Sequence, residues 1–249
     1  MPTSRIKAVV AEIMASPLVK GTPTERFCDL SEHQIWGHID QIPVEDAGRI
    51  IGICDRPLNP KSILGDSMIG ISSDMLVSGD TKILNLFDAD WDNHPFFLVV
   101  EQTSMVGIVT PSDLNKLPVY AAIFDLIALL EDRLTKFLDR KPTNDMRLNI
   151  FSPRELGRTN KAFAALKRGG FDISRLQVLY LEEKLRLYLH EQPDRDLTNE
   201  SIAAVTELRN KVTHQNPLVN SIDHIAGLGT ILRLLLSIIS ALPAATEVP

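Results

Sequence analysis

Residues 96–113, FFLVVEQTSMVGIVTPSD, decide the fold of the first half of the chain. Two apolar runs, FFLVV and MVGIV, flank the polar segment EQTS, and this pattern is typical of two strands joined by a turn. The lead ahead of them, ISSDMLVSGDTKILNLF (residues 71–87), alternates short strand-like and helical stretches. Together the lead and the strand pair predict one α/β supersecondary unit.

A second, looser copy of this plan lies upstream. QIPVEDAGRIIGICDR (residues 41–56) again places two apolar runs around a polar turn, and IMASPLVKGTPTERF (residues 13–27) supplies the lead. The repeat has a period of about 55 residues and fills residues 13–118 twice. We therefore expect two paired units that bury their faces against each other.

The two copies resemble tandem CBS domains over residues 13–118. This resemblance implies βαββα-type units, which in that family commonly bind adenine nucleotides (AMP, ADP or ATP) in a cleft between them. In the second copy, Gly107 would allow close backbone approach and Thr110 would offer a hydroxyl to phosphate or ribose. Asp113 would accept hydrogen bonds from the ribose hydroxyls. Met75 and Val77, on the strand that opens the unit, would sandwich the base.

The first copy departs from this pattern. Gly52 stands at the glycine position, but Asp55 and Leu58 stand where the threonine and the aspartate are expected. A negative charge would then face the phosphate, so one nucleotide site is favoured over two. The alternative is that both copies form only a dimerisation scaffold, in which the threonine and aspartate of the second copy cap the following helix.

Composition describes an ordinary globular chain. Of its 249 residues, 44% are hydrophobic and 23% are charged, with a net charge of −6. The two cysteines, Cys28 and Cys54, lack metal-ligand spacing, so reduced thiols in a cytoplasm are expected, and the N-terminus predicts no signal peptide. The most apolar stretch, residues 225–242, contains Arg233, two glycines and two serines. It predicts a buried C-terminal helix rather than a membrane span.

After residue 117 the periodicity is helical. Amphipathic or apolar patterns cover residues 118–140, 175–191, about 199–214 and 225–242, which predicts a small bundle of four or five helices. Residues 133–186 hold 13 basic and 6 acidic residues, a local excess that suits a polyanion as well as solvated helix faces. The phosphate partners expected on an RNA track are Arg154, Arg158, Lys161, Lys167 and Arg168. Its aromatic residues, Phe151, Phe163 and Phe171, are expected in the core.

The third helix carries the stretch ELRNKVTH, residues 207–214. At 100° per residue, its apolar stripe lies almost opposite His214, Asn210 lies beside His214, and Arg209 borders the stripe. The stretch resembles the Arg-(four residues)-His motif of HEPN domains, including the polar residue after the arginine. This resemblance covers residues 119–242 at the level of fold, although only these few residues are specific. An idle, exposed histidine is the alternative.

HEPN domains that cleave RNA do so without a metal, and the catalytic residues implied here are Arg209, Asn210 and His214. Histidine titrates near neutrality and can move a proton, while arginine holds a phosphate with a fixed charge. Because Arg209 and His214 lie about 140° apart on an ideal helix, the resemblance implies that two copies pair across a two-fold axis.

The sequence thus predicts an α+β chain, with a tandem CBS module at residues 1–118 and an all-α helical bundle of HEPN type at residues 119–249. The predicted protein is a cytoplasmic homodimer that senses an adenine nucleotide and acts as a metal-independent endoribonuclease. A non-enzymatic nucleotide sensor, with a helical part that serves dimerisation or partner docking, is the alternative. No catalytic cofactor, metal or membrane partner is expected.

Overall fold

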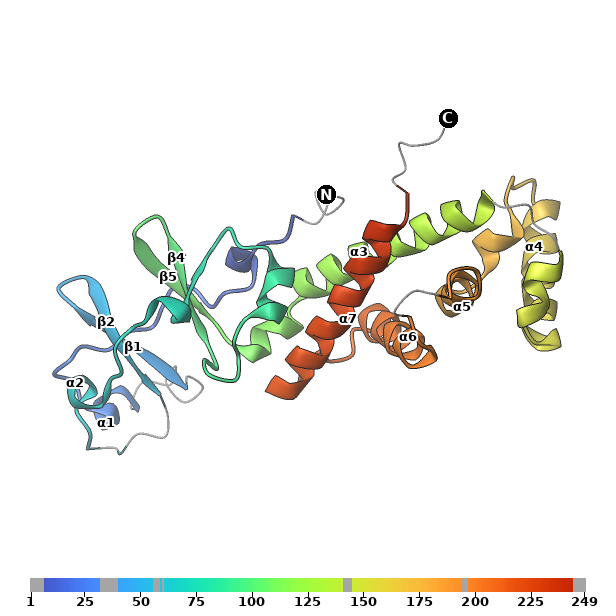
Figure 1. Cartoon of the computed structure of the whole chain (residues 1–249). Helices are drawn as coiled ribbons and strands as arrows, with labels where there is room; N and C mark the ends of the chain where they lie inside the picture. The colour runs from blue at the N-terminus through green and yellow to red at the C-terminus, as the bar shows by residue number, and fades with distance from the viewer. Residues whose placement is uncertain are drawn as a thin grey trace. The chain divides into compact units, whose positions relative to one another are not determined.

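A computed structural model describes residues 7–31, 40–55, 59, 61–140, 145–193 and 197–243 (Figure 1). The chain divides into two compact units. The N-terminal unit comprises Ala8–Val119 together with Val219–Ile225. The helical unit is built mainly from Tyr120–Leu218 and the residues that follow Ile225.

Both predicted strand pairs are present in the N-terminal unit. Strand β1 (Gln41–Asp46) pairs antiparallel with β2 (Arg49–Asp55), and β4 (Phe97–Glu101) pairs antiparallel with β5 (Ser104–Val109). Strand β3 (Leu76–Ser78) adds to β4 in parallel, which completes a three-stranded sheet. The short helices α1 (Phe27–Ser31) and α2 (Leu64–Ser67) belong to the same unit.

Residues at the start of the segment that leads into each hairpin cross to the other repeat. Ala15, which precedes the first hairpin, pairs with Ile108 of the second hairpin, with N···O distances of 2.8 and 3.2 Å. Ile69, which precedes the second hairpin, pairs with Ile53 of the first at 3.0 and 2.9 Å. Each hairpin is therefore bordered on one edge by its own lead, at Gly21 or β3, and on the other edge by residues that precede the other hairpin.

The glycine shared by the two repeats makes room for this crossing. A Cβ atom on Gly107 would lie 2.5 Å from Met14 Sδ and 3.0 Å from the Ala15 carbonyl oxygen. A Cβ atom on Gly52 would lie 2.8 Å from the Ile69 carbonyl oxygen. At each glycine an added Cβ atom would thus lie closer than 3.0 Å to an atom of the crossing segment, so glycine here permits the close approach of that segment.

The C-terminal part is mostly helical. Its long helices are α3 (Leu117–Asp139), α4 (Pro153–Arg168), α5 (Leu181–Glu191), α6 (Asn199–His214) and α7 (Ile222–Ala241). The face of α3 predicted to be apolar is buried at Ile123, Leu126, Ile127, Leu130, Leu134 and Leu138.

Helix α7 is long and apolar enough to cross a membrane by length and composition alone, which is weak evidence because the core helix of a soluble protein passes the same test. Leu235 and Ile239 on this helix are fully buried. The buried Arg133 of α3 also donates a hydrogen bond of 2.8 Å to the Ile239 carbonyl oxygen. These contacts are those of a core helix.

The helical part differs from the prediction in two places. Helix α4 falls in the segment interpreted only as basic, because its face buries few large apolar residues and its pattern is correspondingly weak. The single helix predicted at residues 175–191 is instead a 3₁₀ turn, Arg175–Val178, followed by α5. The break occurs because Tyr180 is extended, and its backbone N–H donates to Glu183 in a cap at 2.8 Å.

Candidate functional site

The N-terminal unit contains a cavity of about 480 Å³, here called the Thr110 pocket. Both repeats line it: Ala15, Asp40 and Gln41 from the first repeat, and Pro95, Thr110 and Asp113 from the second. The crossing segment places Ala15 in this wall, because Ala15 pairs with Ile108 beside Thr110. Thr110 and Asp113, predicted to act together, thus lie in one pocket.

Asp113 is 6% exposed and already has several donors. Its Oδ2 atom accepts from the Thr110 backbone N–H at 2.7 Å and from the Thr110 hydroxyl at 2.9 Å. Its Oδ1 atom lies 2.7 Å from Lys116 Nζ. The pair therefore caps the turn Pro111–Asn115, as the scaffold alternative expects. The Oδ1 atom, which has one partner, nevertheless has capacity for a further donor.

Two predicted nucleotide contacts lie elsewhere. Met75 ends a 3₁₀ turn and Val77 lies on β3 opposite Val99, and neither lines the Thr110 pocket. Gly107 lies against Met14 and Ala15. No local pattern in the sequence singles out Asp40, Gln41 or Pro95, because these residues reach the pocket only through the pairing of the two repeats.

In the first repeat, the residue at the threonine position has a different partner. Asp55 is exposed and accepts a hydrogen bond of 3.0 Å from Gln41 Nε2, and Gln41 in turn lines the Thr110 pocket. Leu58, at the aspartate position, lies outside the described residues.

The HEPN-like motif lies on α6. Thr198 caps this helix through Ser201, and the predicted apolar stripe is buried at Ile202, Val205, Leu208 and Val212. Arg209, Asn210 and His214 are exposed. Asn210 Oδ1 accepts a hydrogen bond of 3.3 Å from Arg209 Nη1, and Asn210 lies one helical turn before His214. His214 is the last helical residue, before Gln215 at a φ of 52°.

Arg209 and Asn210 border a cavity of about 590 Å³ in the helical unit, here called the Lys184 pocket. Its polar lining includes Glu131, Tyr180, Glu182, Lys184, Arg209 and Asn210, together with Gln177 and Thr206. His214 is not among its lining residues. The structure therefore brings Arg209 and Asn210 together with residues of α5 in one pocket, whereas His214, one turn after Asn210 on α6, does not line that pocket.

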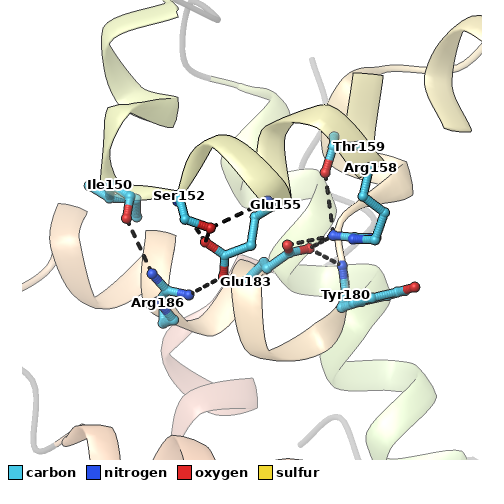
Figure 2. A network of polar contacts seen from close by, with 8 residues as sticks. All are labelled: Ile150, Ser152, Glu155, Arg158, Thr159, Tyr180, Glu183 and Arg186. Atoms are coloured by element: carbon cyan, nitrogen blue, oxygen red, sulfur yellow. Dashed lines mark hydrogen bonds and ion pairs between the residues drawn. The ribbon is translucent and has the colours of Figure 1, made fainter. Parts of the chain in front are cut away.

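The predicted RNA track needs a correction at Arg158. Figure 2 shows this side chain between α4 and α5, where it forms an ion pair with Glu183, which is 4% exposed. Its guanidinium also lies 3.6 Å from the Tyr180 ring centre. Arg158 thus links α4 to α5. Arg154, Lys161 and Arg168 are exposed, as residues that bind RNA phosphates need to be.

Glu155 belongs to the same network of polar contacts. Its Oε2 accepts from the backbone N–H and the hydroxyl of Ser152, both at 2.7 Å, and its Oε1 accepts from Arg186 at 2.6 Å (Figure 2). These bonds, led by those from Ser152, lower the pKa of Glu155 from 4.5 to about 2. Because the carboxylate is 29% exposed, solvent moderates the effect.

We expect Glu155→Gln to flatten the dependence of stability on pH. The lowered pKa means that the carboxylate stabilises the folded state above pH 4.5 and loses this contribution as pH falls towards 2. Wild type should lose about 2 kcal/mol more than the variant between those limits, measured by urea unfolding at each pH. Glu200→Gln, at an exposed carboxylate in the first turn of α6, is the control. If the free energy of unfolding changed with pH in the same way for wild type and Glu155→Gln, the expectation would be contradicted.

No family model matches the chain, and no curated protein matches it. Solved structures do resemble its N-terminal half. They are CBS-domain structures. A CBS-containing hemolysin-like protein of Oenococcus oeni PSU is 17% identical, with a TM-score of 0.36, over 44% of this chain and 90% of that one.

Two further CBS structures hold ligands. The CBS domain of the bacterial CNNM/CorC family Mg²⁺ transporter, in complex with ATP, is 15% identical with a TM-score of 0.36, over 48% of this chain and 90% of its own. The CBS domain pair of protein MJ0100 was solved in complex with 5′-methylthioadenosine and S-adenosyl-L-methionine. It is 21% identical with a TM-score of 0.37, over 44% of this chain and 94% of its own. The resemblance of the helical part to HEPN domains stays a prediction.

Proposed function

We propose that the protein binds an adenine nucleotide in the Thr110 pocket and cleaves RNA through its helical unit, as a cytoplasmic homodimer. The observation that carries the first half is the convergence of Thr110 and Asp113 on one cavity between the two repeats. A cavity of about 480 Å³ lies within the usual range for small-ligand sites.

The charges in this pocket support a nucleoside held inside with its phosphates outside. Asp40 and Asp113 line it, and among its described lining residues there is no lysine or arginine. Carboxylates accept hydrogen bonds from ribose hydroxyls but repel a chain of phosphates. AMP is therefore expected to bind more tightly than ATP at low salt.

Thr110→Val should weaken AMP binding about 10-fold, because the variant keeps the shape of threonine and removes one hydroxyl donor. The measurement is isothermal titration of AMP into the full chain. Thr103→Val, in the exposed turn between β4 and β5, is the matched control. Equal affinities for wild type and Thr110→Val would mean that the hydroxyl serves only the turn that it caps.

The second half of the proposal concerns Arg209 and His214. In metal-free cleavage, the 2′ oxygen of a ribose bonds to the adjoining phosphorus and the 5′ oxygen leaves. A neutral imidazole of His214 would take the 2′ proton, and a protonated imidazole would supply the proton that the 5′ oxygen needs. Arg209 would stabilise the charge on the phosphate oxygens.

A second copy of the chain is part of this proposal. Arg209 lines the Lys184 pocket and His214 does not, so one chain offers the phosphate partner and the proton carrier on different faces of α6. A two-fold pairing of α6 helices would set the histidine of one copy against the arginine of the other.

Cleavage of a mixed labelled RNA in EDTA, with AMP titrated in, tests the whole proposal. We expect cleavage without metal and a rate that changes with AMP, because the nucleotide would favour one of two arrangements of the dimer. An unchanged rate at saturating AMP would exclude the regulation and leave the cleavage.

The second candidate is a nucleotide sensor without enzymatic activity. The observation that favours it is the position of His214 outside the Lys184 pocket. On this interpretation the helical unit only dimerises or docks a partner, and RNA stays intact in the same assay.

A further inference from the structure

Lys184 is a buried cation that the fold does not explain. The residue is 6% exposed and lines the Lys184 pocket. Among the described residues its ammonium group has no hydrogen-bond or ion-pair partner, but its nitrogen is not one of the fully enclosed unpartnered atoms and so keeps some access to solvent. Burial lowers the pKa of Lys184, although the more distant Glu131, Asp139 and Asp132 act in the opposite direction. Partial desolvation disfavours the charged form of the ammonium group, and an anionic ligand in the pocket would offset this.

Tyr180 provides a fixed aromatic surface in the same pocket. Its side chain is 61% exposed, which is unusual for a large hydrophobic residue. The Arg158 guanidinium stacks on the ring at 3.6 Å, and Glu183 holds both Arg158 and the Tyr180 backbone N–H (Figure 2). The ring is thus held in place before any ligand arrives. Fixed exposed rings of this kind stack on nucleobases in single-strand binding proteins.

The remaining polar residues define the ligand further. Arg209 and Asn210 add a second cation and an amide, while Glu131 and Glu182 add hydrogen-bond acceptors. A bare anion would gain nothing from the two carboxylates. A ligand that combines an anionic group, a flat face and hydroxyl or amino donors matches all of these residues, and a nucleotide combines them.

We propose that the Lys184 pocket binds one nucleotide of an RNA strand, with its phosphate on Lys184 and Arg209 and its base stacked on Tyr180. This inference rests on the proposed function, and it assigns the substrate side of that site. Lys184 and Tyr180 act as binding and positioning residues beside the scissile bond.

The test is direct binding of a short fluorescent 2′-O-methyl oligouridylate, measured by anisotropy on the full chain. The probe lacks the 2′-hydroxyl needed for cleavage, and it lacks the adenine expected in the Thr110 pocket. Lys184→Met should weaken binding about 10-fold and lower the slope of log affinity against log salt by about 1. Tyr180→Ala should weaken it about 10-fold, and Tyr180→Phe should retain it.

Stability separates a binding role from a structural role. Lys184→Met should raise the melting temperature by about 2–4 °C, because it replaces a partly desolvated ammonium group with an apolar side chain, whereas a structural lysine would lower the melting temperature when replaced. Lys136→Met is the matched control, because Lys136 is an exposed lysine of α3 paired with Asp132 at 2.7 Å. It should bind the probe as wild type does.

The outcomes distinguish this inference from the proposed function. Wild-type affinity in Lys184→Met, or no binding by wild type, would overturn the inference even if RNA is cleaved. Lys184-dependent binding without any cleavage of unmodified RNA would support the pocket and overturn the nuclease. Competition by free UMP as strong as that of the oligonucleotide would overturn the assignment to a strand.

Discussion

His214→Ala is expected to reduce metal-free RNA cleavage by about 10²- to 10⁴-fold, the usual contribution of a positioned acid or base. The fold should be unaffected, because His214 is exposed and is the last residue of α6, so its removal leaves no cavity. The measurement is the initial rate of cleavage in EDTA, beside far-UV circular dichroism and the melting temperature.

His190→Ala is the matched control for this experiment. His190 is also exposed and also lies in the last turn of its helix, α5, so the two substitutions change charge and helix end alike. Loss of cleavage in both variants would point to helix stability rather than to chemistry. Equal cleavage by wild type and His214→Ala would remove the histidine from the reaction.

Glu183→Ala is expected to destabilise the helical unit by about 3–5 kcal/mol, which is the usual result of removing one partner of a buried ion pair. The variant leaves the Arg158 guanidinium beside the Tyr180 ring without its counterion and the Tyr180 backbone N–H without its acceptor (Figure 2). The measurement is urea unfolding followed by helical circular dichroism, which reports mainly on the helical unit.

Two further variants make this result specific. Glu182→Ala changes the neighbouring exposed carboxylate and should cost less than about 1 kcal/mol. The double replacement Arg158→Met with Glu183→Met should recover most of the loss, because a buried pair can often be replaced by apolar residues. A cost below about 1 kcal/mol for Glu183→Ala would show that the pair is not desolvated.

The elements that could be predicted from the sequence are those with a strong local period. The two hairpins alternate apolar and polar runs, and the inner face of α3 repeats its leucines and isoleucines at helical spacing, so both are present as expected. Helix α4 escaped prediction because its buried face is small. The break before α5 depends on one capping contact between Tyr180 and Glu183. The periodicity of apolar residues over a long segment does not reveal a single contact of this kind.

In the candidate sites, too, only residues that form a local pattern in the sequence could be predicted. Thr110 and Asp113 could be chosen from a motif three residues apart, whereas Ala15 and Asp40 join them through pairings distant in sequence. In the helical unit, geometry on one ideal helix placed Asn210 beside His214. Both residues lie on α6 one turn apart, as expected, whereas the pocket that Arg209 and Asn210 share with residues of α5 could not be derived from one helix alone.

Because segments cross between the two repeats, both repeats must be synthesised before either can fold completely, and the two are expected to be inherited together. As the chain leaves the ribosome, Ala15 emerges about ninety residues before its partner Ile108. Until the second hairpin has been made, the first segment has no place to dock, and a gene fragment that encodes one repeat would leave one edge of its hairpin open to other strands. Duplication or loss of a single repeat is therefore unfavourable, and the pair is expected to be gained, shuffled and lost as one piece.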